Sequence, residues 1–87
     1  MEAANASLDR HQPSEALVQV SQYQRLYPRG KLTVEAEVIR LEALVELGRY
    51  DEARRVANAF LRSFPNALQV PRVRSLLRQI DEAHEAP

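Results

Sequence analysis

The 87-residue sequence predicts an all-α chain of five helices, folded as a right-handed solenoid of helical hairpins. No segment alternates between apolar and polar residues with the period of two that a strand requires. Apolar residues recur instead at three- and four-residue spacings, and the two glycines and five prolines fall almost entirely at breaks between such stretches. The pattern also recurs after 37 residues, which is typical of a helical-hairpin array.

The first three helices are expected in the N-terminal half. A short Ala-rich helix should run from Glu2 to about Arg10, with Leu8 as its only large apolar residue. The second should span Ser14 to Tyr27, with apolar positions at Ala16, Leu17, Val20, Tyr23 and Tyr27. The third, Leu32 to Leu47, has two apolar stripes: Val34, Val38, Leu41 and Val45, and Ala36, Ile39, Ala43 and Leu47. A helix that is apolar on two sides is expected to have neighbours on both.

The last two helices follow Gly48, which suits the left-handed turn that often ends a helix. In the fourth, Asp51 is a plausible N-cap and Pro65 ends the helix. Its apolar face comprises Ala53, Val56, Ala57, Phe60, Leu61 and Phe64. The fifth should run from Pro71 to about His84, with Val73, Leu76, Leu77 and Ile80 on its apolar face.

A shift of 37 residues superimposes the second helix on the fourth. Glu15-Ala16 falls on Glu52-Ala53, Tyr23 on Phe60, Arg25 on Arg62, Tyr27 on Phe64 and Pro28 on Pro65. The same shift places His11 at the turn position of Gly48, where we interpret it as a tolerated turn residue and not as a ligand. If the third helix is moved back by 37 residues, it would begin before residue 1. Either the first helix is truncated or the chain is cut from a longer protein, and we favour the second interpretation.

The stretch from Val34 to Ala67 resembles a tetratricopeptide repeat (TPR). Gly48, Tyr50, Asp51, Glu52 and Ala53 match the family's inter-helix turn, and Pro65-Asn66 matches its closing Pro-Asn. The resemblance implies one TPR-like domain over residues 1–87, with repeat one about 1–30 and N-terminally truncated, repeat two about 32–67 and a capping helix about 70–85. Glu37, Arg40 and Leu41 depart from the family's early aromatic residue and Leu-Gly pair.

The Phe60/Phe64 ending is similar to that of a TPR variety found in the bacterial cell envelope. This likeness implies a domain of a larger bacterial protein. The domain would be cytoplasmic as it stands, or periplasmic if it is cut from a single-pass envelope protein.

Composition argues against several classes of function. Twelve basic and twelve acidic residues cancel, which removes a whole-chain attraction to nucleic acid or to an anionic membrane. There is no cysteine, His11 and His84 are isolated, and two glycines cannot form a phosphate-binding loop. No apolar run approaches the roughly 20 residues that span a bilayer. We therefore expect no enzyme activity, cofactor, metal, nucleic acid or membrane insertion.

The TPR resemblance implies a concave groove lined by the first helix of each hairpin. Its positions here are Glu35, Val38, Glu42, Val45 and Glu46 on the third helix, and Arg72 and Gln79 on the fifth. Such a groove would be acidic with an apolar floor, and would suit a basic, partly apolar peptide. The alternative is a solvated face on which Arg40, Arg49 and Arg72 balance the glutamates. The family's clamp for an acidic peptide C-terminus is absent.

Two further hypotheses concern the remaining surface. A structural homodimer, formed by helix swapping or by end-to-end stacking through the first and fifth helices, would bury Leu8, Val73, Leu77 and Ile80. A convex arginine stripe comprises Arg54, Arg55, Arg62, Arg72, Arg74 and Arg78. Asp51, Glu52, Asp81 and Glu82 interleave with it, so a salt-bridged face is expected there and not a nucleic-acid site.

Overall fold

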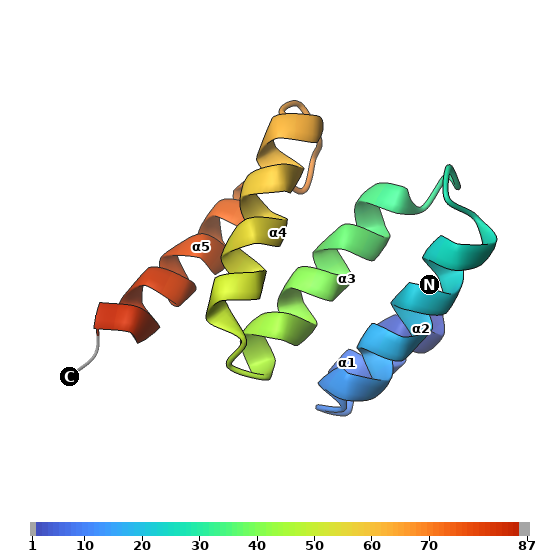
Figure 1. Ribbon diagram of the computed structural model, residues 1–87, viewed down its shortest axis with the longest axis horizontal. Coiled ribbons are helices and arrows are strands. Elements are labelled where there is room, and N and C mark those ends of the chain that lie inside the picture. Colours follow the sequence, from blue (N-terminus) through green and yellow to red (C-terminus); the bar gives the residue numbers. More distant parts are fainter. Residues whose placement is uncertain (1, 86–87) are drawn as a thin grey trace.

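A computed structural model describes residues 2–85 of the chain and the side chains as far as residue 83. Its helices are α1 (Glu2–Asp9), α2 (Pro13–Leu26), α3 (Thr33–Glu46), α4 (Tyr50–Ser63) and α5 (Val70–Glu85). Successive helices run in opposite directions, so the α2–α3 and α4–α5 loops lie at the same end of the molecule (Figure 1). Residues 2–85 contain no strand, and the prediction of an all-α chain with five helices is confirmed.

The 37-residue repeat is present in the backbone. Helix α4 begins 37 positions after α2 begins (13 and 50) and ends 37 positions after α2 ends (26 and 63). The aromatic pairs at the two helix ends also match, with ring centroids 5.4 Å apart for Tyr23 and Tyr27 and 5.3 Å apart for Phe60 and Phe64. In both units, therefore, the two aromatic rings at these equivalent positions lie against each other.

The turns that precede α2 and α4 are also equivalent. Gly48 has a φ of +75° and His11 a φ of +57°, and both lie in the left-handed region. The amide of Arg49 donates to the carbonyl of Leu44 at 2.9 Å, and that of Gln12 donates to Ser7 at 2.8 Å. These six-residue hydrogen bonds define Schellman caps, so the predicted left-handed turn at Gly48 is confirmed and His11 has the same conformation.

The predicted N-cap of α4 is wrong. Helix α4 begins at Tyr50, and its N-cap is Arg49, whose side chain makes no capping hydrogen bond. The Schellman cap of α3 already includes Arg49, so α4 starts directly after it. Asp51 and Glu52 lie instead in the first turn, where carboxylates favour the positive end of the helix dipole.

Helix α3 contributes to both apolar clusters of the core. Its residues Leu41 and Leu44 join a larger cluster with Ala53, Ala57 and Phe60 of α4 and Val73, Leu76 and Ile80 of α5. Ala36, Ile39 and Ala43 join a smaller one with Ala4, Ala16 and Val20. The prediction that α3 has neighbours on two sides is confirmed, with two changes in detail: Leu44 is buried outside both predicted stripes, and Leu47 is exposed.

Contacts between helices make the odd-numbered helices one continuous row. Helix α3 contacts α1 and α5 as well as its sequence neighbours α2 and α4. The backbones of α2 and α4 are farther apart, with no Cα atoms of the two helices within 8 Å of each other among the described residues. Neighbouring helices therefore lie closer together on the side formed by α1, α3 and α5 than on the side formed by α2 and α4.

Candidate functional site

The seven residues predicted to line a groove lie around two adjoining hollows on the row of α1, α3 and α5. One hollow, of about 180 Å³, is lined by Asn5, Glu35, Val38, Ile39, Glu42 and Gln69. The other, of about 430 Å³, is lined by Leu8, Asp9, His11, Glu42, Val45, Glu46, Arg72, Leu76 and Gln79. Glu42 borders both, so the two hollows form one surface, which we call the groove.

Helical spacing explains why these side chains converge. On α3, Val38, Glu42 and Val45 follow Glu35 at spacings of 3, 7 and 10 residues, which are positions on one face of a helix. Arg72 and Gln79 are two turns apart on α5, which packs alongside α3. The partly buried valines form an apolar floor between the carboxylates.

Polar contacts cross the groove at two places. The Nε of Arg72 on α5 donates to Oε1 of Glu42 on α3 at 3.0 Å. The Nδ1 of His11 lies 2.8 Å from Oε1 of Glu46, which ties the α1–α2 turn to the end of α3. These pairs are exposed, so each contributes little to stability and can exchange with a ligand.

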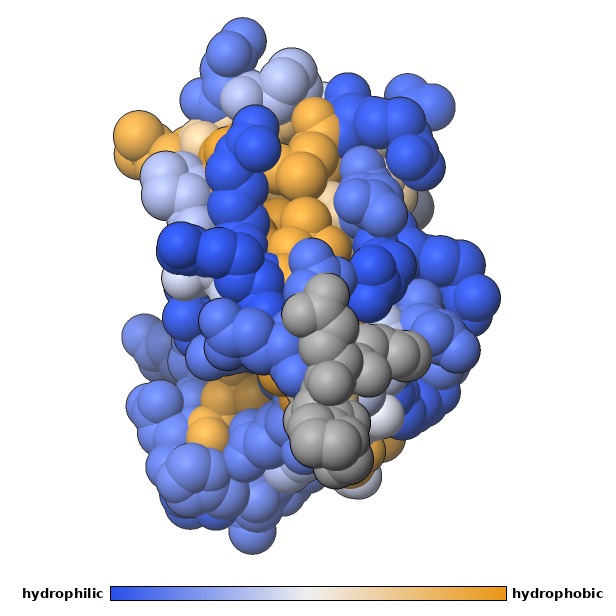
Figure 2. All heavy atoms as spheres, turned by 90° about the vertical axis from the view of Figure 1, so that its left-hand side faces the viewer, coloured by the Kyte–Doolittle hydropathy of each residue, from blue (hydrophilic) through white to orange (hydrophobic). Residues whose placement is uncertain are grey.

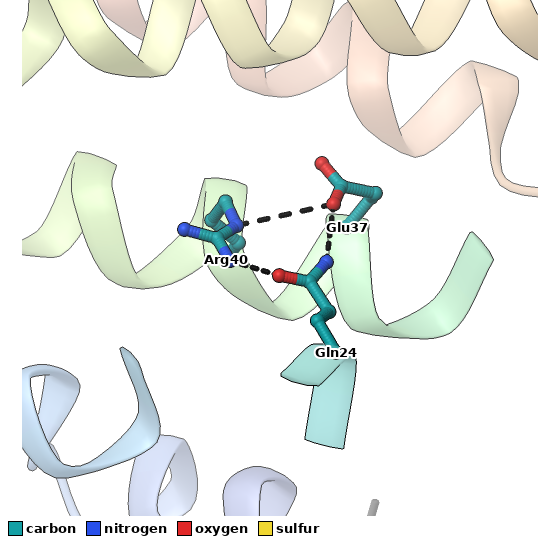
Figure 3. Close-up of polar contacts among 3 residues, drawn as sticks. All are labelled: Gln24, Glu37 and Arg40. Carbon is teal, nitrogen blue, oxygen red and sulfur yellow. Dashed lines mark hydrogen bonds and ion pairs between the residues drawn. The ribbon is translucent and has the colours of Figure 1, made fainter. Parts of the chain in front are cut away.

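Of the three arginines that were considered as balancing charges, only Arg72 lies at the groove. Arg40 contacts Glu37 and Gln24, which join α3 to α2 in a polar cluster (Figure 3). Arg49 pairs with Glu52 at 2.5 Å. Four carboxylates therefore border the groove, from Asp9, Glu35, Glu42 and Glu46, and Arg72 is the one arginine or lysine among its described lining residues.

Sequence reasoning missed the contribution of α1 to the groove. Asn5, Leu8 and Asp9 line it, and they stand 37 positions before Glu42, Val45 and Glu46. Moving the groove positions of α3 back by one repeat would have found them. The pairing of His11 with Glu46, 35 residues apart, had no local signal in the sequence.

The predicted salt-bridged arginine stripe is present only in part. Arg54 pairs with Asp81 at 2.9 Å, as expected for a solvated convex face. Arg72 does not belong to this face, because its side chain lies at the groove. The residues of α2, α3 and α4 also border a hollow of about 410 Å³ that includes Arg25, Arg40, Arg49 and Glu52.

The described residues contain no group of three or more His, Cys, Asp or Glu side chains placed to hold a metal ion. The side chain of His84 lies outside the described residues. Among residues 2–85, no helix combines the length and apolar character needed to cross a membrane. Comparison with known family models, characterised proteins and solved structures gives no match.

Proposed function

We propose that this chain is a non-enzymatic protein–protein interaction module, a TPR-like domain of a larger bacterial protein. It is a short right-handed solenoid of helical hairpins that binds a basic, partly apolar peptide in the groove. The observation that carries this proposal is the convergence of all seven predicted residues on one continuous surface. The 37-residue recurrence of helix bounds and caps supports the hairpin array.

Charge distribution favours a cationic ligand. The chain as a whole is neutral, yet four carboxylates and one arginine border the groove. Glu35 is exposed and forms no ion pair with a described residue, so it is the natural first contact for a lysine or arginine. A ligand cation near Glu42 would compete with Arg72 for the same oxygen, while ligand leucines would cover Val38 and Val45.

Binding to short peptides that alternate lysine with leucine tests the proposal, measured by fluorescence polarisation with matched glutamate–leucine peptides. The chain should bind the basic peptide, and binding should weaken as salt is added. The variant Glu35→Lys, Glu42→Lys, Glu46→Lys should lose it. Equal binding by this variant, or a preference for the acidic peptide, would contradict the proposal.

A control with the same net charge separates the groove from a general electrostatic effect. Glu15→Lys, Glu52→Lys and Asp81→Lys reverse three carboxylates that do not border the groove. The exposed pairs lost in this control contribute little to folding, so both variants should keep the helical circular dichroism of the parent. The control should still bind the basic peptide.

Structural self-association is the second candidate function. An apolar strip bordered by hydrophilic residues lies on the α5 side of the molecule (Figure 2), where Pro71, Arg74, Leu77 and Arg78 line a hollow. Leu8 and Leu77 are only partly buried and could join such an interface. Val73 and Ile80 are fully buried within the chain, so end-to-end stacking would not need to cover them.

A further inference from the structure

The end of the molecule that carries the α2–α3 and α4–α5 loops has an unusual surface. We call this the loop edge and define it as residues 25–32 and 62–69. Both segments lie at the same end of the helices (Figure 1). Helices α3 and α5 begin there and helices α2 and α4 end there, so positive and negative ends of helix dipoles both face this edge and largely cancel.

The loop edge includes exposed apolar side chains from both of its segments. Leu68 is 95% exposed, Leu26 is 69% exposed and Tyr27 is 57% exposed. Single exposed apolar residues are ordinary on a protein surface. Here three of the five large exposed apolar residues of the described chain share one end, and two of them are at or beside loop tips.

The same edge is cationic. Arg25, Arg29, Lys31 and Arg62 are exposed there, and none of them forms an ion pair with a described residue. The sequence has no Asp or Glu from residue 16 to 34, nor from residue 53 to 80. The neutral total of the chain therefore conceals a local excess of positive charge at this end.

The α2–α3 loop holds its part of the edge in a fixed conformation. The amide of Leu32 donates to the Tyr23 hydroxyl at 3.1 Å, and the Thr33 hydroxyl donates to the carbonyl of Gly30 at 2.6 Å. The Tyr23 ring also packs against Tyr27. Leu26, Tyr27 and the nearby cations are thus presented without a large ordering cost on binding.

We infer that the loop edge rests on an anionic lipid surface. The cations attract the acidic headgroups. The side chains of Leu26 and Leu68 and the amphipathic ring of Tyr27 would lie at the boundary between headgroups and acyl chains. A nucleic acid would use the cations and the tyrosine but leave both leucines in water. The protein lies on the membrane in this arrangement. The groove meets the loop edge at Gln69, and its other end, at Val45 and Glu46, is left free for a ligand.

Co-sedimentation with vesicles tests the inference directly. The chain should bind vesicles of phosphatidylcholine that contain phosphatidylglycerol, should not bind phosphatidylcholine alone, and should lose affinity as salt rises. Each lysine or arginine near the surface contributes about five-fold, so Arg29→Gln with Lys31→Gln should weaken binding about 25-fold. Leu26→Ser with Leu68→Ser should weaken it several-fold. All four side chains are exposed, so the variants should fold.

Two control variants match these changes away from the loop edge. Val18→Ser alters an apolar side chain that is 56% exposed on the middle of α2, and Arg55→Gln removes an exposed cation near the start of α4. Neither should change vesicle binding by more than about two-fold if the edge is the contact. An equal loss from the controls would overturn the inference.

Because the chain has no cysteine, a single Leu68→Cys variant can carry an environment-sensitive fluorophore. Its emission should shift to the blue on anionic vesicles, whereas a label on Val18→Cys should not shift. Failure to bind anionic vesicles would overturn the inference. The inference would also be overturned if the chain bound the vesicles without a shift at position 68 and without a loss in the leucine variant. That result would mean that the cations attract any polyanion and that the leucines do not enter the lipid.

Discussion

The two equivalent caps give the sharpest test of the repeat. Gly48 adopts a φ of +75°, and a Cβ added there would meet no atom within 4 Å. Replacing Gly48 by Ala therefore changes backbone energy and nothing else. A left-handed conformation costs an L-residue about 1–2 kcal/mol, and the stiffer unfolded chain returns about 0.4–1 kcal/mol. Gly48→Ala should lower the free energy of unfolding by about 1 kcal/mol.

His11 occupies the same place in the preceding unit with a φ of +57°, so the opposite change should have the opposite sign. The exposed contact between His11 and Glu46 complicates the measurement, because His11→Gly removes it. Making the change in a Glu46→Ala background takes that contact out of both proteins. There, His11→Gly should raise the free energy of unfolding by about 1 kcal/mol.

Urea unfolding followed by far-UV circular dichroism measures both effects. The slope of the free energy of unfolding against urea concentration should be unchanged. In thermal unfolding, a change of about 1 kcal/mol corresponds to roughly 4–8 °C for a domain of this size. A Gly48→Ala variant more stable than the parent would refute the assignment of the left-handed cap. Shifts of the same sign for the two variants would refute the equivalence of the two turns.

Three further predictions concern stability, each measured by urea unfolding. Leu44 is 1% exposed, so Leu44→Ala should cost about 2–5 kcal/mol through lost burial and the cavity left behind. A Cβ on Gly30 would lie 2.3 Å from the Tyr23 hydroxyl oxygen, so Gly30→Ala should cost about 1–3 kcal/mol. The cost should fall in a Tyr23→Phe background, and an unchanged cost would locate the clash elsewhere. Arg54→Ala removes an exposed pair with Asp81, and a loss above about 1 kcal/mol would show that this pair is more than a surface contact.

Local patterns predicted the five helices because each one has its own apolar face and its own breaks. The same patterns could not predict which apolar residues of α3 are the most buried. Its two predicted stripes omit Leu44, yet Leu44 is buried, because α4 and α5 together cover a wider sector of α3 than one stripe describes. Leu47 continues a stripe in the sequence but lies at the C-cap, beyond the neighbouring helices, and is exposed.

The groove positions were predicted from the resemblance to a tetratricopeptide repeat, and helical spacing placed those of α3 on one face. Glu35, Glu42 and Arg72 were assigned from their positions, and all three line the groove. Their pairing was not predictable, because the ion pair between Glu42 and Arg72 joins residues 30 apart and depends on how α3 and α5 are oriented. The acidic groove is consequently braced by Arg72, which the sequence had assigned both to the groove lining and to the charges that balance its glutamates.

The two candidate functions make different demands on α5, and its comparison with α3 favours the groove. The 37-residue shift aligns the buried Val73 and Ile80 with Ala36 and Ala43, so α5 keeps the apolar face that packs on the preceding helix. The buried Leu41 lies on the face of α3 that packs against α4. The same 37-residue shift aligns Leu41 with Arg78 of α5, which is exposed. A second copy stacked on α5 as α4 stacks on α3 would bury that guanidinium, which costs several kcal/mol unless a carboxylate pairs with it. Growth by repetition of the internal contacts is therefore disfavoured, whereas the groove needs no such burial.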